Sequence, residues 1–272
     1  GASHPYVSDG GHIFTTTLNL RQDFYDSDNV PINGGTSEIS GNTFRTIPQA
    51  ALQWQYPLIQ QFDKGAMTIE PIVLGNPSTI SNEDNRLIEL NDVNLFSLDR
   101  MPGLDTVDTG PRVAYGVRSQ YMMAQGTSFD ALLGQNYNAN DDTPFPNSTT
   151  PGENFSDYIG RFQMNYQPIT LAYRFALDNS SFSQNRSEVA FGFSKPWFNL
   201  SAAYRLIDKS TYLDKSQEGN IGANLPLSKE WSGCGGAQRD FDLGRMVAAD
   251  AGIIYKNECF NLMLHAMRSY AR

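Results

Sequence analysis

The chain has 272 residues and a formal net charge of −9, and its lysines and arginines form no cluster that could neutralise a nucleic acid backbone. We therefore expect no nucleic acid partner. No run of about 18 apolar residues occurs, which excludes a membrane-spanning helix. A membrane β-barrel is not excluded, because its strands alternate apolar and polar side chains.

An alternation of apolar and polar residues with a period of two is the main pattern along the chain. It appears first in the segments 12–24, 45–58, 66–74, 111–124 and 127–137. In 157–167, Tyr158, Gly160, Phe162, Met164 and Tyr166 alternate with Ile159, Arg161, Gln163, Asn165 and Gln167. Successive side chains of a strand point to opposite faces, so each segment predicts a strand with one apolar and one polar face.

The same pattern continues to the end of the chain. Further candidate strands occupy 169–178, 188–194, 198–206, 218–228, 232–243, 246–255 and 259–270. The total is about thirteen strands, most of about ten residues. This length suits a tilted membrane strand of about 9–11 residues, whereas strands of soluble domains usually have about five or six.

The connections from residue 157 onward tend to alternate between short and long. The segments 167–168 and 195–196 are short, whereas 179–184 and 208–216 are longer; the turn near Gly244 fits least well. Short turns at one rim and longer loops at the other are typical of membrane barrels. Two much longer connections, near 75–110 and 138–156, are rich in Asn, Asp, Pro and Thr and are predicted to be surface loops on the long-loop side.

These patterns predict an all-β fold, a transmembrane antiparallel up-and-down β-barrel, with residues 1–272 forming part of one domain. A soluble β-sandwich also alternates, with its apolar face inward. Two arguments favour the barrel. About thirteen long strands in sequence would enclose a lumen too wide for side chains to fill. Aromatic residues also lie near strand ends, among them Trp54, Tyr56, Tyr166 and Trp197.

In this barrel the polar residues of each alternating segment are expected to face the lumen. The lumen-facing candidates are Arg161, Gln163, Asn165, Arg174 and Arg205. Ordinary lining of a wet lumen is the alternative to a specific role in binding.

No residue pattern predicts a catalytic, metal or cofactor site. The three histidines, His4, His12 and His265, form no ligand-spaced pair on one strand, and neither cysteine has zinc-site spacing. His265 lies on the polar parity of the last strand. It offers a candidate base for an outer-membrane hydrolase, although a single lumen-facing histidine is more often structural.

Cys234 and Cys259 are candidates for a disulfide. If 232–243, 246–255 and 259–270 form a meander, the first and third strands are about 9.6 Å apart, twice the strand spacing. A disulfide requires Cα atoms within about 7 Å, which argues against a direct bond between these two cysteines. Both would lie at the short-turn rim, and a partner outside this chain is plausible for at least one.

Several segments together resemble the LptD family of lipopolysaccharide-assembly proteins, also called organic solvent tolerance proteins. They are Trp54–Leu58, Ile69–Ile72, Asn82–Asp84, Asn91–Arg100, Gly110–Arg118, Leu171–Phe175 and Asn257–Phe260. The order and spacing of these segments carry the resemblance, which runs over nearly the whole chain.

The resemblance implies an outer-membrane barrel that inserts lipopolysaccharide into the outer leaflet by lateral release through a seam, without enzymatic activity or cofactor. It implies a plug lipoprotein in the lumen and periplasmic bridge proteins that deliver lipopolysaccharide. This chain would cover roughly the second half of the barrel and lack its true C-terminus. Cys259 stands where the family carries a cysteine bonded to its N-terminal domain, whereas Cys234 has no family counterpart that we can name.

Three other functions remain open from the sequence. A passive outer-membrane porin or nutrient channel would have a constriction with opposed charge clusters and no dedicated plug. A hydrolase would lose its activity in the variant His265→Ala. A soluble β-rich binding domain would remain in solution without detergent.

Overall fold

The computed structural model describes residues 1–31, 38–77, 90–101, 107–108, 110–124, 126–139, 154–208 and 215–270. These residues form 15 β-strands, and they include no helix long and apolar enough to cross a membrane. The strands are β1 (Ala2–Val7), β2 (Ile13–Pro31), β3 (Glu38–Gln55), β4 (Leu58–Phe62), β5 (Gly65–Asn76), β6 (Arg112–Met123), β7 (Ser128–Asn138), β8 (Tyr158–Tyr166), β9 (Ile169–Leu177), β10 (Gln184–Lys195), β11 (Phe198–Ile207), β12 (Ser216–Pro226), β13 (Trp231–Asp240), β14 (Arg245–Lys256) and β15 (Asn261–Ser269).

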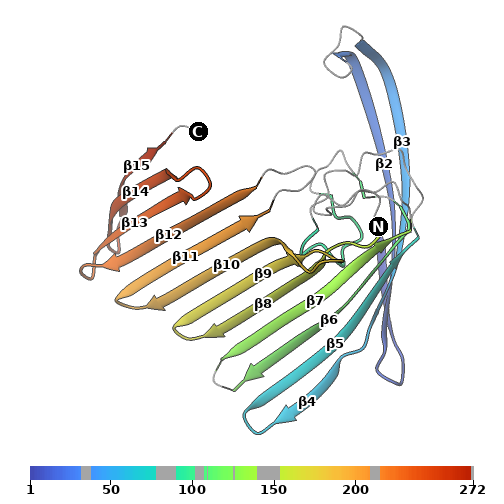
Figure 1. Cartoon of the computed structure of the whole chain (residues 1–272), viewed down its shortest axis with the longest axis horizontal. Coiled ribbons are helices and arrows are strands. Elements are labelled where there is room, and N and C mark those ends of the chain that lie inside the picture. Colours follow the sequence, from blue (N-terminus) through green and yellow to red (C-terminus); the bar gives the residue numbers. More distant parts are fainter. Residues whose placement is uncertain are drawn as a thin grey trace.

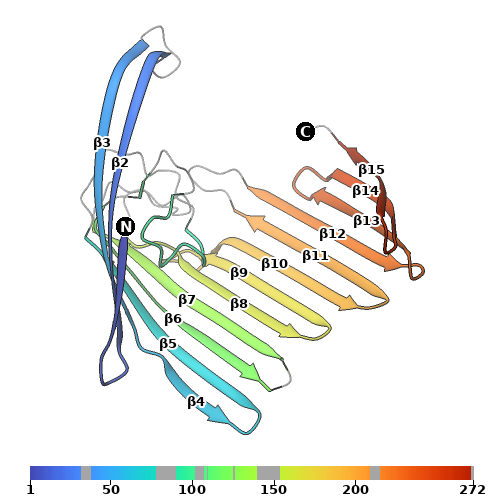
Figure 2. The same cartoon turned by 180° about the vertical axis from the view of Figure 1, so that it is seen from behind.

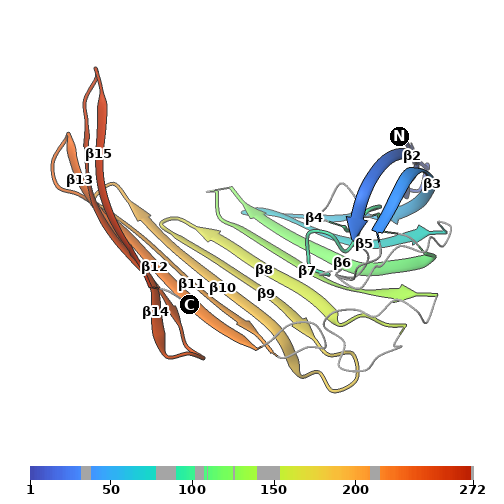
Figure 3. The same cartoon turned by 90° about the horizontal axis from the view of Figure 1, so that it is seen from above.

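The strands form one antiparallel meander in which each strand pairs with the next along the chain (Figures 1 and 2). The exception is β4, which lies off the main path and pairs with β5 beside the last residues of β3. The sheet curves so that its two ends bend towards the same side (Figure 3). We call the inner side of this curve the concave face. The predicted antiparallel, up-and-down order is confirmed, and within the described residues the sheet is open.

The structure has two strands more than the thirteen expected. The first, β1, contains Pro5 and lacks a clear alternation; pairing with β2 places it in the sheet. The second, β4, was not predicted, because the candidate segment 45–58 contained only its first residue, Leu58. Strand β3 ends instead at Gln55, and a new strand starts after Pro57, which has no backbone N–H to donate to a ladder.

Two strands are much longer than expected and form an arm. β2 has 19 residues and β3 has 18. From Asn19 to the end of β2, and from the start of β3 to Ala51, the two strands pair only with each other, and this arm rises out of the sheet (Figure 1). Within the arm, Asp23 accepts hydrogen bonds from Arg21 at 2.9 Å and from Arg45 at 2.5 Å.

Short and long connections alternate along the whole sheet. The connections 8–12, 63–64, 124–127, 167–168, 196–197, 227–230 and 257–260 lie at one rim, which we call the short-turn rim. The strand ends that flank the connections 77–111, 139–157, 178–183, 208–215 and 241–244 lie at the opposite, long-loop rim, and the arm of β2 and β3 extends on the same side (Figure 1). The turn at 241–244 is the shortest at the long-loop rim, which explains why the alternation was weakest there.

The two faces of the sheet differ in chemistry. Residues directly opposite each other on paired strands lie on the same face, so the register assigns every strand residue to a face. The outer face exposes large apolar side chains such as Leu133 (51% exposed) and Ile253 (47% exposed). The concave face carries most of the charged and amide side chains. An apolar face turned outward is what a lipid environment requires.

Aromatic side chains gather near both rims. At the short-turn rim, Trp54 and Tyr56 lie against His12, Phe62 contacts Tyr121, Trp197 stacks on Phe198, and Trp231 contacts Tyr255. At the long-loop rim, Tyr137 contacts Phe155, Tyr158 stacks on Phe182, and Tyr204 contacts Phe241. Two such girdles flank the apolar band of a membrane barrel, because aromatic rings favour the interface between lipid and water.

Candidate functional site

Part of the long connection between β5 and β6 packs against the concave face. Sequence analysis placed this connection among the surface loops. Its described residues 90–101 and 107–108, which we call the docked segment, lie instead over the sheet on its concave side (Figure 3). The cluster beneath the segment contains Leu90 and Leu95 of the segment together with Ala51, Leu74, Ala114, Ile159 and Ala176 of the sheet. The connection 138–156 is described only at its two ends.

A tight turn shapes the start of the docked segment. The side chain of Asn91 accepts hydrogen bonds from the backbone N–H groups of Val93 and Asn94, and the Asn94 side chain accepts one from Asn91. Asparagine favours such turns because its side chain bonds nearby backbone groups. The turn directs Leu95 onto the sheet, where this side chain is fully buried over Gly134. A Cβ atom at Gly134 would lie 2.7 Å from Leu95 and also 2.7 Å from the backbone oxygen of Tyr115, which cannot move aside, so glycine is required here.

Asp92 joins the docked segment to two strands of the sheet. Its carboxylate lies 3.1 Å from Arg161 of β8 and 3.2 Å from Arg174 of β9. The Asp92 side chain is only 2% exposed, so both arginines neutralise a buried charge. Arg161 also pairs with Asp130 of β7, which accepts a further hydrogen bond from Gln120 at 3.0 Å.

A second ion-pair cluster holds the end of the docked segment. Asp108 accepts hydrogen bonds from Arg100, at 2.5 Å, and from Arg112 at the start of β6, and all three side chains are buried. Burial disfavours the charge on Asp108, but the hydrogen bonds and positive charges of the two arginines outweigh this effect. The pKa of Asp108 therefore lies below that of an ordinary aspartate. Gln49 of β3 adds a hydrogen bond to the backbone carbonyl of Asp108 at 3.2 Å.

The five predicted lumen residues all lie on the concave face. Arg161 and Arg174 hold the docked segment, as described above. Gln163 lies opposite Asp130, and Asn165 donates a hydrogen bond to Ser128 at 3.1 Å. Arg205 lies apart from the docked segment, 3.4 Å from Glu218 of β12.

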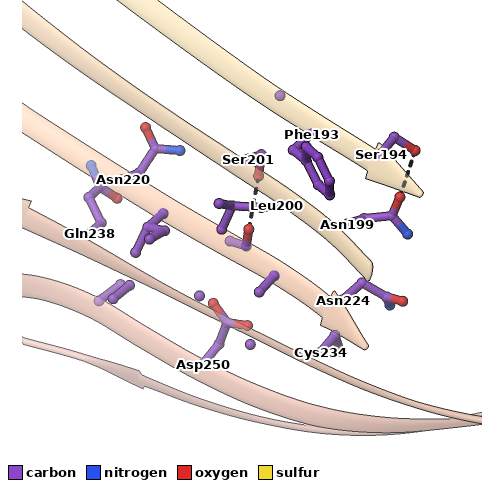
Figure 4. Close-up of a pocket in the computed structure, with 18 of the residues that line it drawn as sticks. Phe193, Ser194, Asn199, Leu200, Ser201, Asn220, Asn224, Cys234, Gln238 and Asp250 are labelled. Carbon is purple, nitrogen blue, oxygen red and sulfur yellow. Dashed lines mark hydrogen bonds between the residues drawn. The ribbon is translucent and has the colours of Figure 1, made fainter. Parts of the chain in front are cut away.

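Beside the docked segment, the concave face of β9–β14 forms an open groove with a volume of about 740 Å³ (Figure 4). Its floor is one register row of mostly small residues: Thr170, Gly192, Ser201, Gly222, Gly236 and Asp250. Amide side chains border this row, including Asn199, Asn220, Asn224 and Gln238.

His265 and Cys234 lie at the β14–β15 end of the groove, whereas Cys259 lies away from it, in the turn at 257–260. His265 of β15 has its Nε2 atom 3.1 Å from the Asp250 carboxylate, and no serine of the described residues is bonded to its ring. Cys234 lies opposite Gly252, which in turn lies opposite His265. Cys259 does not begin a strand as expected but lies exposed in the turn at 257–260, because Asn257 caps the backbone N–H of Cys259. Both cysteines are free thiols in the structure.

Sequence reasoning missed the acidic partners of the predicted arginines. Asp92, Asp108 and Asp130 were not singled out, although the first lies in the segment Asn91–Arg100 that carried the family resemblance. The signal that was present is a set of leucines, at 90, 95 and 98, in a polar connection. The segment Asn82–Asp84 of that resemblance lies outside the described residues.

Comparison with protein families matches residues 1–231 to the family described as LptD, LPS transport system D. The chain matches no individual curated protein. The family match covers most of the chain, and it agrees with the outward apolar face, the two aromatic girdles and the alternating rims of the sheet. The chain therefore belongs to the LptD family, whose members are integral outer-membrane β-barrel proteins that transport lipopolysaccharide into the outer membrane and are not enzymes.

Proposed function

We propose that all 272 residues belong to a single outer-membrane barrel domain and that the concave face is part of the wall of its lumen. The observation that carries this proposal is the separation of the two faces along most of the sheet. Large apolar side chains are exposed on the outer face, whereas the concave face bears the paired charges. A closed barrel with this many strands encloses a space too wide for its own side chains to fill.

In this proposal Arg161, Gln163, Asn165, Arg174 and Arg205 face the lumen. Two of them have a defined role, since Arg161 and Arg174 hold the docked segment through Asp92. Gln163 and Asn165 line the wall on β8, and Arg205 lines it on β11, apart from the docked segment. These three meet water, the plug or the substrate.

The partners follow from the wide lumen and from the rims. A plug lipoprotein occupies the part of the lumen that the docked segment leaves open. Periplasmic bridge proteins deliver lipopolysaccharide at the short-turn rim, because short turns of outer-membrane barrels face the periplasm.

The substrate is an amphiphile, which determines how it leaves. Its saccharide and phosphate groups remain in water along a polar lumen, whereas its acyl chains need an apolar path. A closed wall offers none, because all backbone groups in the bilayer must be hydrogen-bonded between strands. Release therefore occurs laterally, through an opening between two strands into the outer leaflet.

The test is depletion of the full-length protein in its own bacterium, with pulse-labelled lipopolysaccharide as the readout. The expected result is that new lipopolysaccharide stops reaching the surface and accumulates at the inner membrane. A passive channel would give the opposite result, namely unchanged surface lipopolysaccharide and slower uptake of small solutes. Purification in detergent adds a second check, because a dedicated plug is expected to copurify with the barrel and a simple pore has none.

A further inference from the structure

The outer face of the sheet carries very few charged side chains. From β4 to β15, the strand residues on this face include only three, which are Lys195, Arg239 and Arg268. Lys195 is the last residue of β10, at the short-turn rim. Arg239 and Arg268 are the second-to-last residues of β13 and β15, near the long-loop rim. Because a lipid environment disfavours a charge on this face, two neighbouring arginines there point to a ligand.

Both arginine side chains are directed towards the long-loop rim. The guanidinium of Arg239 lies over the ring of Phe241, 5.7 Å from its centroid, and that of Arg268 lies over the ring of Tyr270, 4.9 Å from its centroid. In each pair the aromatic residue follows the arginine by two positions, on the side of the rim. A long basic side chain on a lipid-facing surface extends in this way to bring its charge to the level of the lipid headgroups, where aromatic rings also lie.

Neither arginine forms an ion pair with a residue that the structure describes. Among these residues, the side chain of Arg239 donates a single hydrogen bond, to the Gly244 carbonyl at 3.4 Å, and the side chain of Arg268 donates none. Asp240 directly follows Arg239 but faces the concave side, opposite Glu218. Both arginines are exposed, so their charges are available to an anion from the membrane.

One strand, β14, separates the two arginines. Their strands are therefore about 9.6 Å apart, which is twice the strand spacing. Met246 of β14 lies opposite Arg239 on the outer face, and the next residue, Val247, accepts a backbone hydrogen bond from Tyr270 beside Arg268. Towards the middle of the strands this face is apolar, with Ala237, Ala249, Ile253 and Leu264. The arrangement fits an amphiphile with an anionic headgroup at the rim and acyl chains along the wall.

We propose that Arg239 and Arg268 bind the phosphate groups of a lipopolysaccharide molecule that resides in the outer leaflet. The longer loops of outer-membrane barrels face outwards, so this rim meets the leaflet into which the family transports lipopolysaccharide. Lipopolysaccharide carries phosphate next to its acyl chains, and the planar fork of arginine binds phosphate with two parallel hydrogen bonds.

This inference goes beyond the proposed function, because it concerns a resident lipid outside the wall and not the substrate in the lumen. The family match ends at residue 231, so both arginines lie beyond the matched residues.

The test uses the full-length protein with a photoreactive amino acid at Met246. Val113 is the matched reference position, because it is likewise the second residue from the long-loop end of its strand and lies on the outer face. In cells, both probes are expected to crosslink to lipopolysaccharide of the surrounding leaflet. Extraction into detergent disperses the bulk lipid, so the crosslink should then persist at Met246 and be lost at Val113.

Substitution of the arginines tests which groups hold the lipid. In the double variant Arg239→Gln with Arg268→Gln, the crosslink at Met246 in detergent should fall at least about tenfold, because charge-assisted hydrogen bonds are lost. Lys195→Gln is the control, since it removes a charge from the same face at the opposite rim. Removing a charge from a lipid-facing surface does not hinder folding, and equal amounts of folded barrel are compared.

Four outcomes would overturn the inference. The first two are an unchanged crosslink in the double variant and an equal loss in Lys195→Gln. The third is an equal crosslink to added lipopolysaccharide whose phosphates have been removed. The fourth is an equal crosslink to added phosphatidylglycerol, which would assign the arginines to anionic phospholipids in general. All four leave the proposed function intact, because depletion of the protein tests that function separately.

Discussion

The substitution Asp92→Asn tests how the docked segment is held. It preserves the shape of the side chain but removes the charge and turns an N–H₂ group towards two guanidinium groups that cannot accept a hydrogen bond. The segment is then expected to leave the sheet more often, while the strands beneath it remain paired.

The structure sets the size of this effect. A hydrogen bond to a charged group contributes about 1.5–3 kcal/mol when it is shielded from water. The Arg161 side chain is 18% exposed, so its bond to Asp92 falls in that range, whereas Arg174 is 40% exposed and its pair is screened by solvent. The total is about 2 kcal/mol or more, which corresponds to a roughly thirtyfold larger undocked population.

Hydrogen exchange of the Leu95 and Ser97 amides measures this population in the detergent-solubilised protein. Both amides are bonded within the docked segment, to the carbonyls of Asn91 and Asn94, and they exchange when the segment opens. The variant Asp63→Asn makes the same change in charge at the short-turn rim and should leave their exchange unaltered. If Asp92→Asn also leaves exchange unaltered, the ion pairs do not hold the segment.

Three further predictions concern acid, lipid and thiols. The pKa of Asp108 is lowered in the folded state, so its carboxylate stabilises the docked segment fully above the ordinary carboxyl pKa, and this stabilisation is lost only as pH falls through the lowered value. Amide hydrogen exchange of the docked segment, corrected for intrinsic rates, should therefore be equal at about pH 7 and 5 and should rise in stronger acid. Ala202→Arg on the outer face should cost about 2–4 kcal/mol in urea unfolding from lipid vesicles, whereas Ala203→Arg on the concave face should cost little, and equal costs would refute the assignment of faces. In the reduced protein, a membrane-impermeant maleimide should label the exposed Cys259 faster than the half-buried Cys234, and the opposite order would contradict the geometry of the turn.

A strand could be predicted from the sequence wherever apolar and polar residues alternate and the apolar residues are the ones that face outward. In β8 and β9 every second residue is apolar and faces outward, so a single segment reveals both the strand and its faces. The two strands that were missed have proline as the obstacle: Pro5 lies within β1, and Pro57 separates β3 from β4. There the pairing partner decides the structure, and the partner lies elsewhere in the sequence.

The docked segment could not be predicted from local sequence patterns either, because its partners also lie far away in the sequence. Asp92 meets Arg161 across 69 residues of sequence, and no period marks such a contact in advance. The composition of the connection, rich in polar and turn-forming residues, favoured a surface loop. The fact that Leu95 is fully buried shows that a few apolar residues are enough to reverse this expectation when a polar wall offers them an apolar patch.

The two halves of the concave face have different tasks in a transport protein. Beneath the docked segment, buried ion pairs and leucines fix a part of the chain itself. Beside the open groove, a separate row of Arg174, Glu188, Arg205 and Glu218 alternates in sign across neighbouring strands, so opposite charges largely cancel one another. If this face lines the lumen as proposed, a wall of paired charges and neutral amides gives a moving substrate many weak contacts and no single strong one. This is what passage requires, because a site that bound lipopolysaccharide tightly would hold it instead of releasing it.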